Sequence, residues 1–340
     1  MQNSSSYRRL IALAVTLTFG LIMLGAYVRL SDAGLGCPDW PGCYGQVSPF
    51  QAQQQIALAV AEQGGEYGPV SMGKAWREMT HRYVAKALGL LVIVIAVMAW
   101  RRRAALQQSP ALATALVGVV ILQGIFGMWT VTLLLRPAIV TGHLVGGLLT
   151  FALLLWLWLR QLPPPRYLDA GPVAALRLPA ALGLVLLSAQ IFLGGWTSTN
   201  YAALACTDLP TCQGQWWPQM NFSDAFHFVR ELGRTGDGQI LPGQALTAIH
   251  FMHRIGAVIV AAWLGWLGWR ALQVDGTRRL GVALLAALGL QWALGLSNVR
   301  FGLPMGIAVA HNGGATLLLG LLVVLLFRAR QAGRFGIAGW

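Results

Sequence analysis

Four of the six histidines in this 340-residue chain occupy positions that could bind a metal-containing cofactor. His81 and His143 each stand near one end of a long apolar segment, and His253 and His311 repeat this placement in the second half. A polar ring within an apolar membrane segment is costly and is by default a functional residue. A single such histidine is more often a hydrogen-bonded core residue, but four histidines in two matched pairs favour ligation.

Two histidines that face each other across a four-helix bundle can hold the iron of a porphyrin from both axial sides. A bare metal ion would need three or four ligands, and each half of the chain offers only two such histidines. We therefore predict one haem in each half. Five arginines near the ends of apolar segments suit the propionate carboxylates of such rings or, alternatively, extend to the membrane surface: Arg29, Arg82, Arg136, Arg254 and Arg300.

The two halves differ three residues before the first histidine of each pair. Glu78 precedes His81, whereas His250 precedes His253, and residues three apart share one helix face. A carboxylate beside a ring-binding histidine suits proton transfer or the stabilisation of positive charge, although it would also be favourable as an ordinary residue at a helix start. The difference predicts chemistry in the first half and a permanent cofactor in the second, where His250 is either an indirect support of His253 or its rival as ligand.

All four cysteines stand in two C-x5-C pairs within polar loops, Cys37 with Cys43 and Cys206 with Cys212. A short ring of this kind suits a disulfide, and the spacing disfavours a zinc site. For the second pair a structural clip is the favoured interpretation. For the first pair a redox role is an alternative, because exposed disulfides are the labile ones. His227, which has no partner in the other half, is expected to be a surface residue.

Membrane-spanning helices are the elements that position these residues. The chain is 56% hydrophobic and only 10% charged, which is too apolar for a soluble protein. Two amphipathic loop segments, 51–63 and 222–233, are predicted to be surface helices. Eight segments are long enough to cross a hydrocarbon core of about 30 Å, which takes about 20 helical residues: near 10–29, 83–100, 111–134, 138–159, 175–197, 248–270, 279–298 and 307–327.

The net charge of +13 indicates membrane topology, and not nucleic acid binding, in a chain this apolar. One side of the predicted bundle collects fourteen basic residues and only two acids, and basic residues are retained in the cytoplasm. We therefore predict a multi-pass inner membrane protein with both termini in the cytoplasm. The cysteine-bearing loops would then lie outside, where disulfides persist.

The chain repeats itself at about half its length. The pattern predicts an all-α polytopic membrane protein whose eight transmembrane helices form two pseudo-symmetric four-helix bundles, residues 1–165 and 166–340. Five landmarks recur in the same order at offsets of 168 to 172: Cys37, His81, Gln123, His143 and Gly146 return as Cys206, His253, Gln291, His311 and Gly314.

At these residues the chain resembles the haem A synthases, membrane enzymes of cytochrome oxidase biogenesis. The resemblance covers nearly the whole chain and rests on the eight spans, the duplicated four-helix unit, the paired histidines, the Cys pairs and the motif Glu78-x-x-His81-Arg82. It implies an oxidoreductase that converts a methyl group of haem O to a formyl group and so yields haem A.

The same resemblance implies a role for each candidate residue. His81 and His143 would hold the substrate haem in the half formed by residues 1–165, with Glu78 as the catalytic carboxylate. His253 and His311 would ligate a resident haem B in the half formed by residues 166–340. Cys37 and Cys43 would be a redox-active or haem-transfer pair, and the role of Cys206 and Cys212 stays open between a clip and a redox pair.

Partners and rival functions follow from the same residues. The resemblance implies haem O synthase as the source of substrate, an unidentified electron partner and the surrounding lipid bilayer. A di-haem B membrane cytochrome linked to quinol is the first alternative, but both histidine pairs lie toward one side and Glu78 would have no use in it. A haem delivery protein is the second, but it does not explain a permanently held haem. The Gly- and Trp-rich spans suit a homo-oligomer and a monomer equally.

Overall fold

The structure is a computed structural model that describes residues 2–63, 65, 68–163 and 169–335. Eight helices are long and apolar enough to cross a membrane, which confirms the prediction of an all-α protein with eight spans. The described residues contain no β-strand, only isolated bridges in the loops. The spanning helices are α1 (Gln2–Leu30), α3 (Met72–Arg101), α5 (Ala111–Thr132), α6 (Pro137–Leu159), α8 (Arg177–Thr199), α10 (Gly243–Leu272), α11 (Arg278–Arg300) and α12 (Met305–Phe335).

These helices follow from their composition and their end signals. Each has 22 residues or more, so each exceeds the roughly 20 residues that a hydrocarbon core requires. The Ser71 hydroxyl caps α3 by accepting from the Lys74 amide, and Pro137 occupies the first turn of α6, where its missing N–H has no consequence. Large apolar side chains such as Leu90 and Val185 are each 65% exposed on the outside of the bundle, as expected where the solvent is lipid.

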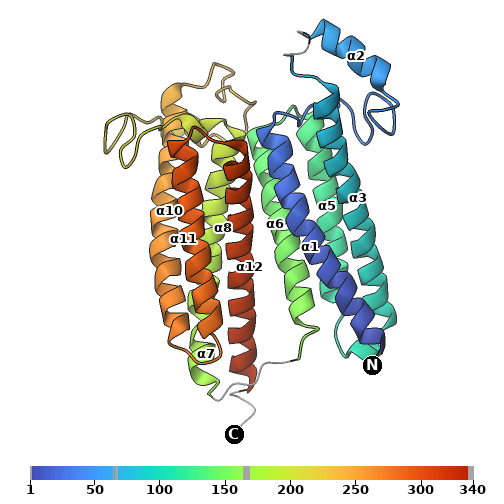
Figure 1. The fold of residues 1–340 in the computed structure, drawn as a ribbon, viewed down its shortest axis with the longest axis vertical. Helices are drawn as coiled ribbons and strands as arrows, with labels where there is room; N and C mark the ends of the chain where they lie inside the picture. Colours follow the sequence, from blue (N-terminus) through green and yellow to red (C-terminus); the bar gives the residue numbers. More distant parts are fainter. Residues whose placement is uncertain (1, 64, 66–67, 164–168, 336–340) are drawn as a thin grey trace.

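The spanning helices pack in two closed cycles (Figure 1). In the first, α1 contacts α3 and α6, and α5 joins α3 to α6; in the second, α8 contacts α10 and α12, and α11 joins α10 to α12. Helices α1 and α6 contact α12, and α6 also contacts α8, so the two cycles share an apolar core. The predicted boundary between residues 165 and 166 lies outside the described residues.

The two ends of the bundle differ. We call the end with the loops that join α1 to α3 and α8 to α10 the loop face, and the end at which α1 begins and α12 ends the terminal face (Figure 1). The shorter helices are α2 (Gln53–Glu62), η2 (Ala202–Leu204) and α9 (Phe222–Ala225) on the loop face, and α4 (Arg103–Leu106) and α7 (Gly171–Ala175) on the terminal face.

Helix α2 confirms the surface helix predicted at 51–63. The surface helix predicted at 222–233 is wrong after its first four residues, which form α9. The chain leaves the helix after Ala225, and Arg230 turns inward in the segment that follows. There its guanidinium donates to the Asn200 side chain and lies 5.6 Å from the Trp196 ring centroid.

The two spanning helices that carry the first histidine of each pair begin earlier than their apolar segments indicate. Helix α3 begins at Met72 instead of near residue 83, and α10 begins at Gly243 instead of near residue 248. The extra turns carry polar residues that face the loops. As a result Glu78 and His81 lie well inside α3, where the helix fixes their side chains, and not at a frayed helix end.

Candidate functional site

The two histidines of the first half face each other across the bundle. His81 on α3 and His143 on α6 have ring centroids 6.5 Å apart and ring planes inclined at 76°. A metal held between two imidazoles by bonds of about 2 Å places the ring centroids roughly 6 Å apart. The pair therefore has the separation that two axial ligands of one haem iron require.

Each of the four predicted ligands packs against a glycine of a neighbouring helix. A Cβ added to Gly25 or Gly194 would lie 3.0 Å from Cε1 of His81 or His253 respectively, which is tighter than most real contacts of a Cβ atom. Gly127 and Gly295 stand in the same relation to His143 and His311, at 3.5 and 3.2 Å. The helices thus contact one another at every histidine, and at Gly25, Gly194 and Gly295 a side chain would press on the histidine ring. Our sequence reasoning missed Gly25 and Gly194, although their offset of 169 marks them as repeat partners.

Three of the four histidine rings also lie in surroundings that leave one nitrogen unsatisfied. The Nδ1 atoms of His81, His143 and His311 are buried without a hydrogen-bond partner, an arrangement that native structures reserve for special sites. In the described residues, no three His, Cys, Asp or Glu side chains gather as a bare metal ion would need. The donor set is therefore suited to haem iron, whose other four bonds come from the porphyrin.

Glutamine amides contact the histidines of the second half. Nε2 of Gln190 on α8 lies 3.0 Å from Nδ1 of His253 and donates to the His253 carbonyl at 2.9 Å. Nε2 of Gln291 lies 3.3 Å from Nε2 of His311. Both amides lie where a Cβ at a facing glycine would be, Gly256 for Gln190 and Gly314 for Gln291.

The first half lacks this arrangement. Leu21 stands at the repeat position of Gln190, so nothing equivalent approaches His81. Gln123 faces Gly146 as its repeat partner Gln291 faces Gly314, and Nδ1 has no partner in either His143 or His311. At this position the halves differ only in the contact of Gln291 with Nε2 of His311. The two histidine pairs are thus alike in packing and different in hydrogen bonding.

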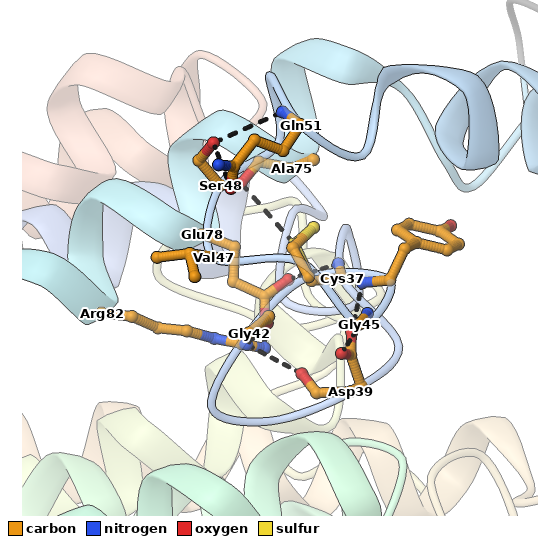
Figure 2. Close-up of a disulfide and its surroundings, with 12 residues drawn as sticks. Cys37, Asp39, Gly42, Gly45, Val47, Ser48, Gln51, Ala75, Glu78 and Arg82 are labelled. Carbon is orange, nitrogen blue, oxygen red and sulfur yellow. Dashed lines mark hydrogen bonds and ion pairs between the residues drawn. A yellow bond between two sulfur atoms is a disulfide. The ribbon is translucent and has the colours of Figure 1, made fainter.

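Glu78 connects helix α3 to the first disulfide loop (Figure 2). The residue is only 5% exposed, and its side chain forms an ion pair with Arg82 and accepts a hydrogen bond from the Cys37 amide at 2.8 Å. Arg82 in turn donates to the carbonyls of Asp39 and Gly42. A buried carboxylate needs such compensation, because an unpaired charge is costly away from water.

The second half repeats this network with an imidazole in place of the carboxylate. The Cys206 amide donates to Nδ1 of His250 at 3.3 Å, and Arg254 donates to the carbonyls of Cys206, Asp208 and Thr211. His250 therefore contacts the loop, as Glu78 does, and not the glutamine-contacted pair.

Both cysteine pairs form disulfides, Cys37–Cys43 and Cys206–Cys212, and all four residues are fully buried. In the second loop the Asp208 carboxylate accepts from the Thr211 hydroxyl and from the amides of Gly214 and Gln213, which together hold the pKa of Asp208 well below its usual range. In the first loop, burial and then the carboxylates of Asp39 and Glu78 raise the pKa of Tyr44. The polar groups of both loops are thus held by loop carboxylates together with side chains of α3 and α10.

The five arginines predicted to contact propionates have different surroundings. Arg82 and Arg254 donate to loop carbonyls, as described. Arg29 donates to the Ser198 carbonyl at 2.7 Å and lies 4.0 Å from the Tyr201 ring centroid. Arg136 lies 3.8 Å from the Glu231 carboxylate, and Arg300 lies 6.0 Å from the Phe301 ring centroid. His227 is exposed, as expected.

Comparison with known proteins shows the family to which the chain belongs. The model of a family of cytochrome oxidase assembly proteins, COX15-CtaA, matches residues 8–323. A haem A synthase of Shewanella oneidensis is 44% identical over 92% of this chain and 94% of its own length. Those of Allorhizobium ampelinum and Granulibacter bethesdensis are 27% and 29% identical, over 96% and 92% of this chain and 91% and 84% of their own lengths. The chain belongs to the COX15-CtaA family of cytochrome oxidase assembly proteins.

Proposed function

We propose that this protein is a haem A synthase, a membrane oxidoreductase that converts a methyl group of haem O to a formyl group. The facing pair His81 and His143, at a separation suited to one iron, is the observation that carries the proposal. The relatives that match over nearly the whole chain bear the name haem A synthase, and the buried Glu78 supplies a carboxylate close to that pair.

The first half would hold the substrate. His81 and His143 would bind the iron of haem O, and Glu78, one helical turn from His81, would hold or move a proton during oxidation of the methyl group. The Arg82 guanidinium compensates the charge of Glu78, and the Cys37 amide fixes one of its oxygens. Neither Nδ1 of this pair has a hydrogen-bond partner, whereas Gln190 contacts Nδ1 of His253 in the second half, so this pair suits a ring that must enter and leave.

The second half would hold haem B, a resident group that supplies one-electron chemistry when bound. His253 and His311 are its proposed axial ligands. Hydrogen bonds to the far side of a ligating imidazole orient it and strengthen the metal bond. The Gln190 contact at Nδ1 of His253, which has no counterpart at Nδ1 of His81, therefore favours permanent binding here.

The same proposal gives the reaction a cellular location and two protein partners. Both termini would lie in the cytoplasm and the disulfide loops outside the inner membrane, in an oxidising compartment. Haem O synthase would supply the substrate, and an electron partner would exchange electrons with the protein during oxidation of the methyl group.

The decisive experiment is acid extraction of haems from a host that lacks its own haem A synthase, with and without this chain. We expect haem A to be found only when the chain is expressed, because only a synthase changes the identity of the haem. A di-haem cytochrome or a haem delivery protein would leave haem O as the end product. Haem O without haem A in the expressing cells would contradict the proposal.

Replacing Gln190 with leucine should loosen the resident haem, because it gives His253 the surroundings that Leu21 gives His81. Loss of a hydrogen bond of this kind lowers metal affinity by roughly 10- to 100-fold. We expect less haem B per protein after purification and a shifted low-spin electron paramagnetic resonance signal. Gln123→Leu, which removes a glutamine from a spanning helix of the first half, is the control and should keep both. An unchanged signal and haem content in Gln190→Leu would remove Gln190 from the cofactor site.

A further inference from the structure

A groove on the terminal face lies far from both histidine pairs. It has a volume of about 610 Å³ and lies where α7 and α8 pack against α12. Its walls are mainly small or aliphatic, and two arginines complete them: Ala174, Ala175, Leu178, Ala181 and Leu326, with Arg177 and Arg330. The combination of apolar walls and two cations within a membrane protein indicates an amphipathic ligand.

The two arginines are available to an anion. Both residues are exposed, and among the described residues neither forms an ion pair with a carboxylate. The Arg330 guanidinium lies 5.7 Å from the ring centroid of Trp156 on α6, a contact that limits its freedom without neutralising its charge. One cation comes from the start of α8 and the other from the last turns of α12, so a single anion could bridge the two helices.

An apolar stripe continues from the groove toward the middle of the bilayer. Leu178, Leu182 and Val185 are 77%, 41% and 65% exposed, and their spacing of four and three residues places them on one face of α8. This stripe offers a path for hydrocarbon chains directly beyond the arginines.

We propose that this groove binds one anionic phospholipid, with its phosphate between Arg177 and Arg330 and its acyl chains along Leu178, Leu182 and Val185. Basic pockets between transmembrane helices recognise acidic lipid headgroups, and guanidinium groups bind phosphate with paired hydrogen bonds. The bound lipid would join α8 to α12. The proposal is independent of the haem chemistry, because no residue of the groove belongs to the histidine or disulfide networks.

Native mass spectrometry of the full-length protein with phosphatidylglycerol or phosphatidylcholine tests the proposal. We expect one phosphatidylglycerol to survive removal of bulk detergent, with a clear preference over phosphatidylcholine. In R177Q/R330Q its apparent affinity should fall roughly tenfold or more, since each arginine near a lipid surface contributes about 1 kcal/mol. Phosphatidylglycerol should also raise the melting temperature of the wild-type protein and not that of the double variant.

Two variants and one competitor complete the experiment. R177K/R330K keeps both charges and should keep the preference for phosphatidylglycerol. R279Q removes an exposed arginine at the start of α11, on the same face and outside the groove, and should bind as the wild type does. Equal binding of the two lipids, an unchanged affinity in R177Q/R330Q, or equal stabilisation by inorganic phosphate would each overturn the proposal, the last by assigning the groove to a free anion.

Discussion

Replacing Glu78 with glutamine is expected to stop the formation of haem A while haem remains bound. The amide has the shape of the carboxylate and can still accept from the Cys37 amide, but it cannot exchange a proton at neutral pH or compensate the charge of Arg82. Positioned acid–base groups contribute rate factors of about 10² to 10⁴, so haem A in the extracted pigment should fall at least about 100-fold. Total haem per protein, measured as the pyridine haemochrome, should stay near the wild-type value.

The repeat provides a control for the structural role of Glu78. His250 contacts the Cys206 amide as Glu78 contacts the Cys37 amide, so His250→Gln perturbs a loop anchor of the same design without touching the proposed substrate half. If Glu78 were only such an anchor, both variants would lower haem A to a similar degree. Undiminished haem A in Glu78→Gln would show that its carboxylate has no part in the reaction.

The fold could be predicted from the sequence because its strongest signal is local. Apolar runs of the length of a bilayer predict spanning helices wherever they occur, and all eight are present. The starts of α3 and α10 could not be placed, because their first turns are polar and face loops instead of lipid. Glu78 is therefore positioned by the polar first turns of α3, which pack against the disulfide loop, and not by the apolar part of that helix.

The candidate site could be predicted only in part. The duplicated histidines could be recognised because imidazoles are rare in apolar segments. The glycines that pack against these histidines could not, because glycine is common in such segments. The directions of Arg82 and Arg254 were also beyond prediction. Each short disulfide loop turns back on its helix and presents carbonyls that need donors, so these guanidinium groups point to the loops.

The most informative difference between the two halves is that Gln190 has Leu21 as its repeat partner. Neither residue shows this when it is considered alone. A glutamine in an apolar segment is itself a signal, but its meaning depends on which helix it faces. The structure places its amide against His253, and the repeat then identifies the leucine that takes its place in the first half. The proposed division into an exchangeable and a permanent site can therefore be tested at the ligands themselves.

Substituting methionine for His253 should disturb the low-spin haem B spectrum and leave the substrate pair intact. A thioether can reach a similar position, but it is a different axial ligand with a different redox potential, and it offers no ring nitrogen to Gln190. We expect retained haem B to fall at least about tenfold or its optical and magnetic signals to change form, together with loss of haem A formation.

His81→Met provides the comparison that separates the two sites. Because His81 and His143 form their own pair on α3 and α6, this variant should retain the haem B signal of the wild type while it loses binding of haem O and formation of haem A. The two variants should therefore share the loss of product and differ in the spectrum. A wild-type haem B spectrum in His253→Met, or its loss in His81→Met, would place the resident haem in the other half and reverse the assignment that the Gln190 contact supports.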